Sequence, residues 1–455
     1  MRRFLFNKFS RVYNLDRWIR RHFTQAGLLL LGGLVTAGAF GLDTRQTLAY
    51  QLFSLLFVLL LLAIISPLFF RKIHLTARRD LPQFATVDET LHYQVQIQNH
   101  TQKLQRSLTL QENVKLNPPS FETFLHAKEP DHEKRNWFDN YVGYPRWSWL
   151  MYLSKGAEIA EQNLPPIPPM PSEKLNLKNV EASLSIKMTL KPLRRGYVHF
   201  TGMSVARPDP FGLFKALYTI DKPDSLLILP KRYPVGEISL FGSRKYQRGG
   251  VSLASSVGDS EEFVSLREYR PGDPLRHIHW KSLAKIGKPV VREFQDEFFV
   301  RHALILDTFT EQYAGEIFET AVSVAASFST APRSHEVLLD LMFVGTKAYH
   351  FTSGRGLAKT DQLLEILACV EACTDQPFHL LPPLVMEHAA SLSGCLCVLL
   401  NWDSARQHFI ESLKNLSLPL LVVVISATEL EIDKKKFPEV HILPIDAIAE
   451  ELVKL

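Results

Sequence analysis

Residues 263–294 read FVSLREYRPGDPLRHIHWKSLAKIGKPVVREF and combine many ionic side chains with turn residues. Pro271-Gly272 predicts a turn, and Asp273 directly after it is a good helix N-cap. Pro274 suits the first helical position, and Gly287 can end the helix. We therefore expect a strand and a turn, followed by a helix of roughly three turns.

The expected helix has one apolar face. Its members recur at helical spacing, and they are Leu275, Ile278, Ser282, Leu283 and Ile286. This face predicts that the segment packs against a core. His277 and His279 form an H-x-H pair, but residues two apart on a helix diverge by about 200° and cannot bind one metal ion.

The same segment concentrates the candidate functional residues. They are Arg267, Glu268, Tyr269, Arg270, Asp273, Arg276, His279, Trp280, Arg292 and Glu293. Two interpretations stay open for them. The charges form an internal ion network that joins neighbouring domains, with Arg270 and Asp273 as a buried pair, or they form a docking patch for an acidic partner or an ATPase.

This pattern resembles the signature of the domain-of-unknown-function 58 family. It opens at Glu262-Phe263, continues from Leu266 to Asp273, and closes from Val291 to Phe294. Two upstream elements also look like parts of that family: Arg195-Gly196-Tyr197, and Asp209-Pro210-Phe211-Gly212-Leu213-Phe214. The resemblance implies two membrane helices, a β-rich domain and a carboxy-terminal domain similar to von Willebrand factor type A. It also implies association with a MoxR-type AAA+ ATPase.

Two apolar runs, Ala26 to Leu42 and Leu52 to Phe70, contain no charged residue. The second reaches roughly the 20 residues needed to cross a bilayer, and glycines in the first favour close helix packing. We therefore expect a transmembrane helical hairpin over residues 26–70. A signal peptide is the alternative for the first run.

The positive charge lies at the amino terminus. The net charge is +5, while residues 1–22 hold seven Lys or Arg and one Asp, so the rest of the chain carries about −1. A nucleic-acid-binding domain needs a basic face, so we expect no nucleic-acid partner. Residues 1–25 are expected to be a basic cytoplasmic arm. The charge bias predicts a multi-pass protein of the bacterial inner membrane, with the bilayer as a partner and both termini and the large domains in the cytoplasm.

The stretch after the apolar runs predicts a β-sandwich of immunoglobulin-like type over residues 72–236. Leu91 to Asn99 alternates apolar and polar residues, as a half-buried strand does. An insertion is expected over residues 113–179, rich in proline and aromatic residues. It contains Trp137, Trp147 and Trp149, which could cover the sandwich, form a membrane-interface belt or bind a partner.

After the signature segment, residues 237–300, strands alternate with helices over residues 301–455. This alternation predicts a doubly wound α/β domain and fits the type A resemblance. Its cysteines, Cys369, Cys373, Cys395 and Cys397, are expected to be reduced core residues.

The type A resemblance implies a metal-binding loop of the form Asp-x-Ser-x-Ser after the first strand. Here that stretch is Asp307-Thr308-Phe309-Thr310-Glu311, with both serines replaced. The remaining candidate ligands are Asp307, Thr308, Thr310 and Asp403. Because a phenyl ring cannot coordinate an ion, we expect a degenerate site without a metal.

No nucleophile elbow, phosphate-binding loop or zinc-protease motif is present, so we expect no catalytic residues and no cofactor. The leading hypothesis is a membrane-anchored, non-enzymatic adaptor that presents a type A-like domain to a MoxR-type AAA+ ATPase, in complex assembly or envelope maintenance. The alternative is a metal-dependent or hydrolytic enzyme that uses the Arg/Asp/His cluster of the signature. The client and the oligomeric state stay open.

Overall fold

The structure is a computed structural model of the whole chain. It describes residues 2–41, 47–69, 73–101, 103–115, 121, 124, 149–151, 155–168, 183–236, 263–273, 275–294, 300–310, 315–331, 337–354, 360–374, 376–427, 430 and 432–455. The chain divides into two compact units, Met1–Lys231 and Arg232–Leu455.

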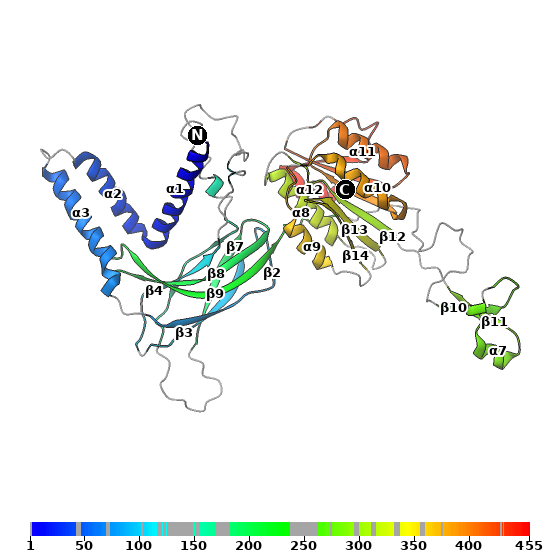
Figure 1. Cartoon of the computed structure of the whole chain (residues 1–455), viewed down its shortest axis with the longest axis horizontal. Helices are drawn as coiled ribbons and strands as arrows, with labels where there is room; N and C mark the ends of the chain where they lie inside the picture. The colour runs from blue at the N-terminus through cyan, green and yellow to red at the C-terminus, as the bar shows by residue number, and fades with distance from the viewer. Residues whose placement is uncertain are drawn as a thin grey trace. The chain divides into compact units, whose positions relative to one another are not determined.

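The first unit begins with three helices, α1 (Arg2–His22), α2 (Gln25–Gly41) and α3 (Thr47–Ile65). α2 and α3 lie side by side, and the chain turns sharply between α1 and α2 (Figure 1). A short 3-10 turn, η1 (Ser66–Phe69), follows α3.

The expected transmembrane hairpin over residues 26–70 is not found. Among the described residues, no helix combines the length and the apolar character needed to cross a membrane. α2 has 17 residues, about 26 Å, and α3 has 19 residues, about 28 Å. Both are shorter than the hydrocarbon core of about 30 Å. The fold class that included this hairpin and the multi-pass inner-membrane localisation are therefore wrong, and the chain is a mixed α/β protein with several sheets.

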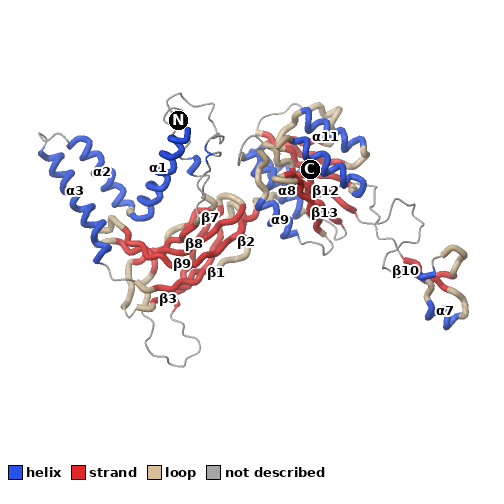
Figure 2. The backbone as a smooth tube through the Cα atoms, viewed as in Figure 1, coloured by secondary structure: helices blue, strands red, loops and turns tan. Residues whose placement is uncertain are grey.

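Two sheets complete the first unit (Figure 2). One has the order β1 (Leu75–Asp80), β3 (Leu91–Asn99), β7 (Ser183–Pro192) and β5 (Ala157–Ile159). The other has the order β2 (Phe84–Thr86), β9 (Lys215–Leu229), β8 (Gly196–Pro208), β4 (Leu108–Val114) and β6 (Gln162–Leu164). All neighbours are antiparallel except β2 and β9.

One hydrophobic core joins the two sheets. The expected alternation on β3 is confirmed, because Tyr93, Val95 and Ile97 are buried while His92 and Gln94 are exposed. These three buried side chains belong to the same cluster as buried residues of β8 on the other sheet. The sheets therefore form a sandwich.

Part of the expected insertion, residues 113–179, belongs to the sandwich. β5 pairs with β7, and β6 pairs with β4. Trp149 is half-buried against a small cluster built on Phe9 of α1. Trp137 and Trp147 lie outside the described residues.

An ion pair lies between the two sheets. The Arg79 guanidinium donates to both carboxylate oxygens of Glu112, at 3.1 and 2.5 Å, and its carbon lies 4.3 Å from the centre of the Phe200 ring. The Tyr93 hydroxyl also donates to Glu112 (2.9 Å), and burial raises the pKa of Tyr93. Both carboxylate oxygens of Glu112 therefore accept hydrogen bonds, which allows this ion pair to be buried in the core.

The corner between α1 and α2 packs on the end of the β8–β9 hairpin. Phe23 forms an isolated β-bridge with Phe214, and the ring centroids are 5.3 Å apart. Thr24 donates its N–H to the carbonyl of Leu213 (3.1 Å) and its hydroxyl to the carbonyl of Gly212 (2.6 Å). Leu213 and Phe214 share a buried cluster with residues of α1 and α3.

The Asp-Pro-Phe-Gly-Leu-Phe element of the sequence is this turn. The buried Asp209 carboxylate accepts hydrogen bonds from the N–H groups of Phe211 (3.0 Å), Leu213 (2.6 Å) and Phe214 (2.7 Å). Gly212 has a φ of 68°, in the left-handed region that favours glycine. Asp209 therefore fixes the backbone that carries Leu213 and Phe214 to the helices.

The second unit contains a six-stranded sheet. Its order is β14 (Ala348–Ser353), β13 (Val337–Val344), β12 (Val300–Leu306), β15 (Gly394–Leu399), β16 (Leu420–Ser426) and β17 (Val440–Pro444). All neighbours are parallel except β13 and β14. The helices are α8 (Glu316–Thr330), α9 (Thr360–Cys369), α10 (Leu381–His388), α11 (Ser404–Asn415) and α12 (Ile448–Lys454).

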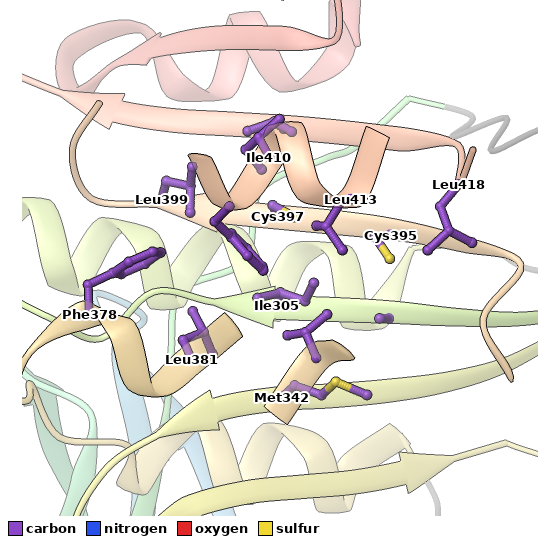
Figure 3. Packing of buried hydrophobic residues seen from close by; sticks show 14 of the residues in the cluster. Ile305, Met342, Phe378, Leu381, Cys395, Cys397, Leu399, Ile410, Leu413 and Leu418 are labelled. Atoms are coloured by element: carbon purple, nitrogen blue, oxygen red, sulfur yellow. The ribbon is translucent and has the colours of Figure 1, made fainter. Parts of the chain in front are cut away.

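Helices cover both faces of this sheet. On one face, Ile305 of β12 and Met342 of β13 pack against Leu381 of α10 and Ile410 of α11 (Figure 3). α8 contacts β12, β15 and β16, and Leu304, next to Ile305 and therefore on the opposite face, is also fully buried. The buried cysteines Cys395 and Cys397 belong to the first of these cores, whereas Cys369 is exposed, contrary to expectation.

We predict that Gly27→Ala loosens the α1–α2 corner. A Cβ at Gly27 would lie 2.1 Å from the Leu213 carbonyl oxygen, so the helix must move away. Gly32→Ala is the matched control on the same helix, because nothing lies within 4 Å of its added Cβ. Hydrogen exchange of the Thr24 amide measures the contact. Faster exchange is expected only in Gly27→Ala, and equal exchange in both variants would contradict this packing.

Candidate functional site

The 263–294 hairpin is a small element of its own. β10 (Phe263–Glu268) and β11 (Val290–Phe294) pair antiparallel, with Leu266 opposite Arg292 and Glu268 opposite Val290. Between the strands lie a 3-10 turn, η3 (Leu275–His277), and a short helix, α7 (Trp280–Ile286). The strand, turn and helix follow in the expected order.

The expected three-turn helix is wrong in length. α7 has seven residues, and its N-cap is His279 rather than Asp273. Ile278 forms an isolated antiparallel bridge with Val291, and the His279 N–H donates to the Val290 carbonyl (2.8 Å). This contact with β11 takes the chain out of helical geometry before α7. Gly287 ends α7 as expected, with a φ of 74°.

Asp273 is bound by Arg267 and not by the side chain of Arg270. Its two carboxylate oxygens accept from the two terminal nitrogens of Arg267, at 2.7 and 2.8 Å. The backbone N–H of Arg270 adds a third bond (2.8 Å). The side-chain hydrogen bonds from Arg267, then the backbone bond from Arg270, lower the pKa of Asp273 to about 2. The pair is also not buried, since the Arg267 and Asp273 side chains are 25% and 14% exposed.

The expected apolar face is only partly covered. Ile278 is buried, together with Val290 and Val291, whereas Leu275, Trp280 and Ile286 are 65%, 63% and 61% exposed. The reason is the short helix, because η3 and α7 do not share one continuous face. The hairpin therefore carries large apolar side chains on its outer surface.

The other signature residues lie around this surface. Arg270, Arg276 and Arg292 are exposed, and Tyr269 is half-buried. Glu268 forms an exposed ion pair with Lys288 (3.6 Å). The ring of His279 lies 2.6 Å from the Ser282 hydroxyl, within its own turn of chain. The side chain of Glu293 is outside the described residues.

A second candidate site lies where the strand order of the α/β sheet reverses. β13 lies on one side of β12 and β15 on the other, and ligands of such sheets bind outside the carboxyl ends of the strands at this point. Asp307 follows β12 directly and is fully buried. Its carboxylate accepts from the N–H groups of Phe309 (3.0 Å) and Leu400 (3.1 Å).

A guanidinium occupies the space between the two expected acidic ligands. Arg406 donates from Nε to Asp307 (2.6 Å) and from a terminal nitrogen to Asp403 (2.5 Å). Its other terminal nitrogen donates to the Phe309 carbonyl (3.1 Å), and its carbon lies 4.6 Å from the centre of the Phe378 ring. Asp403 also caps α11 by accepting from the Arg406 N–H (2.9 Å).

This arrangement neutralises the acidic pair from within the chain. Burial raises the pKa of Asp307, and the charge and hydrogen bonds of Arg406 oppose that effect. Burial acts to lower the pKa of Arg406, but the charges and hydrogen bonds of Asp307 and Asp403 together raise it, so Arg406 stays protonated. The guanidinium holds the position where a cation would bind to these carboxylates.

One of the two hydroxyls expected as metal ligands, that of Thr308, has another role. Thr308 donates its hydroxyl to the Val344 carbonyl, and the N–H of Thr310 donates to the Cys373 carbonyl (3.3 Å). Glu311 lies outside the described residues. In the part of the chain that the structure describes, no three His, Cys, Asp or Glu side chains are grouped to hold a metal ion.

Arg406 is the residue that the sequence analysis missed. The sequence feature that indicates Arg406 is its spacing from Asp403. A side chain three positions after a helix N-cap lies beside the capping carboxylate. A related cluster lies at the other end of the strands, where Arg301 donates to the buried Asp340 at 2.5 and 3.1 Å. The Thr352 hydroxyl also donates to Asp340 (2.6 Å).

Two comparisons place these sites among known proteins. Residues 265–372 match the model of a family described as "Protein of unknown function DUF58", a stretch that includes most of the hairpin and Asp307. The chain is also 28% identical over 211 residues to the "Uncharacterized protein YeaD" of Bacillus subtilis (strain 168). That alignment covers 45% of this chain and 46% of the relative, so the chain spans about half the length of the curated relative.

We predict that the Asp273 carboxyl titrates with a midpoint of about 2, against an ordinary 3.8. Because the folded pKa is lowered, the pair stabilises the hairpin above about pH 4 and loses this effect as the pH falls towards 2. Carboxyl NMR of the full chain measures the midpoint. Arg267→Gln should move it towards the ordinary value. Arg270→Gln is the control and should move it much less, because the residue at 270 contributes chiefly its backbone N–H. The opposite ranking would restore the expected Arg270 pair.

We predict that Arg406→Met lowers the free energy of unfolding of the α/β unit by about 3–5 kcal/mol, because Asp307 is left buried without its counter-charge. Adding Asp307→Asn should recover part of the loss. Asp403→Asn should cost only about 1 kcal/mol, because its side chain is 42% exposed. Urea unfolding of the full chain measures all three.

We predict that the Arg406 guanidinium keeps a tightly held metal ion from binding between Asp307 and Asp403. Calorimetric titration of the wild-type chain with magnesium and manganese should show no micromolar one-to-one binding. Such binding, abolished by Asp307→Asn, would contradict the role assigned to Arg406.

Proposed function

We propose that this protein is a non-enzymatic adaptor that binds an acidic partner protein through the 263–294 hairpin. The observation that carries the proposal is the exposure of Leu275, Trp280 and Ile286 on an element with few residues of its own to cover them. Exposed tryptophan beside basic residues is typical of residues that dominate protein interfaces.

The charge of the hairpin indicates that the partner's surface is acidic. Residues 263–294 hold seven Lys or Arg and three Asp or Glu. Two of the three acids have cationic partners within the hairpin, Asp273 with Arg267 and Glu268 with Lys288. The hairpin therefore offers an excess of positive charge around its apolar side chains, which favours an acidic surface opposite.

A MoxR-type AAA+ ATPase is the partner that the family resemblance suggests. In this proposal the α/β unit acts as a domain similar to von Willebrand factor type A, with Arg406 in place of a bound ion. The relative and the family carry no stated activity, so they support neither this function nor the enzymatic alternative. The alternative is an enzyme that uses the Arg/Asp/His cluster of the signature, and the Asp273 carboxylate of that cluster is engaged by three hydrogen bonds.

We predict that Trp280→Ala weakens binding of the MoxR-type ATPase from the same organism by roughly thirtyfold, about 2 kcal/mol, as loss of an interface anchor does. The measurement is biolayer interferometry with the immobilised full chain. Tyr197→Ala is the matched control, because Tyr197 is 56% exposed but lies on the sandwich. Unchanged affinity in Trp280→Ala, or an equal loss in Tyr197→Ala, would contradict docking through the hairpin.

A further inference from the structure

A groove of about 690 Å³ lies between α1 and the sandwich, within the first unit. We call it the α1 groove. One face of α1 lines it through Tyr13, Arg17, Arg20 and Arg21, which follow one another at helical spacing. The end of β4, residues 111–114, and the whole of β5 line the opposite side. A groove of this volume is large enough for a ligand or a short segment of chain.

The wall of the groove contains an open strand edge. β4 pairs with β8 over Thr109 to Val114, but β6 pairs with its other edge only over Leu108 to Leu110. Residues 111–114 therefore have no partner strand on that edge among the described residues. Four residues of strand are about 13 Å long, and such an edge is a template for an added strand.

Two arginines of the groove, Arg17 and Arg21, have no acidic partner among the described residues. Arg21 donates to the side chains of Asn113 and Ser204, both neutral, and Arg17 donates to the carbonyl of Val114 (3.4 Å). Neither contacts an acidic side chain within the described ranges. Burial, and then the charge of Arg17, lower the pKa of Arg21, so the two cations repel each other across one helical turn.

The acids that line the groove already have cationic partners other than Arg17 and Arg21. They form the ion pairs Asp16–Arg20, Glu112–Arg79, Glu158–Lys155 and Glu161–Lys215. Lys191 adds a further exposed cation at the rim. An anionic group entering the groove would therefore meet Arg17 and Arg21 without displacing an existing carboxylate.

We propose that the α1 groove binds an extended acidic segment of a partner protein, which adds to β4 beside residues 111–114 and places carboxylates against Arg17 and Arg21. The open edge supplies main-chain hydrogen bonds, and the arginines select for negative charge. Asn113 and Ser204 hold the Arg21 guanidinium in position before binding. This site lies in the first unit and is independent of the function proposed for the hairpin.

The test uses the full chain and a fluorescein-labelled octapeptide of alternating valine and glutamate, measured by fluorescence anisotropy. Saturable binding is expected, weakening as salt screens the charges. Arg17→Glu should weaken it by about tenfold or more, since it places like charges together. Arg11→Glu is the control, because Arg11 is exposed on α1 but does not line the groove.

Two further peptides separate strand addition from simple charge attraction. The valine–lysine peptide should not bind. The valine–glutamate peptide with alternate amides N-methylated keeps its carboxylates but loses donors, and it should bind at least about tenfold more weakly. Circular dichroism checks that α1 is intact in each variant, and Arg17→Gln repeats the test with a milder change.

Three results would overturn the proposal: no saturable binding, equal weakening by Arg11→Glu and Arg17→Glu, or equal binding of the N-methylated peptide. None of these results bears on binding of an ATPase to the hairpin, so the two proposals fail separately.

Discussion

The buried contact of Arg406 with Asp307 organises the carboxyl end of the α/β sheet. Asp307 ends β12, while Asp403 begins α11 just after β15, so one guanidinium ties together the two loops at the strand-order reversal. Its bond to the Phe309 carbonyl fixes the first loop further. A charge buried to this extent is tolerated only with several partners, and removing any of them leaves another group unpaired. The shape of this edge therefore depends on Arg406.

The same solution recurs through the chain. Arg79 binds Glu112 between the sheets of the sandwich. Arg301 of β12 binds Asp340 of the neighbouring strand β13. In these two pairs a planar guanidinium donates two bonds to one buried carboxylate, whereas Arg406 shares its bonds between Asp307 and Asp403. These acidic side chains therefore have structural roles. What remains for recognition is the exposed surface, chiefly Arg17 and Arg21 of α1 and the outer residues of the hairpin.

Local patterns predicted the elements better than the contacts between side chains. The alternation from Leu91 to Asn99 is a local signal, because burial of one sheet face selects apolar residues at every second position. The helix end at Gly287 is also local, because its positive φ favours glycine at that position. The choice of Arg267 over Arg270 for Asp273 depends on how β10 pairs with β11, which no periodicity reveals. Likewise, the helix after Asp273 is short because β11 bonds to residues 278 and 279 from a distance in sequence. Apolar content predicted membrane crossing for α2 and α3, but no helix among the described residues is both long and apolar enough to cross a membrane.

Two turns of the chain, one at Asp209 and one at Asp273, lead to apolar side chains in different surroundings. Both combine an aspartate that accepts three hydrogen bonds with a glycine of positive φ, Asp209 with Gly212 and Asp273 with Gly272. The first turn presents apolar side chains that are buried against α1 and α3, so packing within the unit is sufficient reason for its sequence. The second presents Leu275, which is 65% exposed. In the adaptor proposed for this chain, Leu275 belongs to the surface that the acidic partner covers.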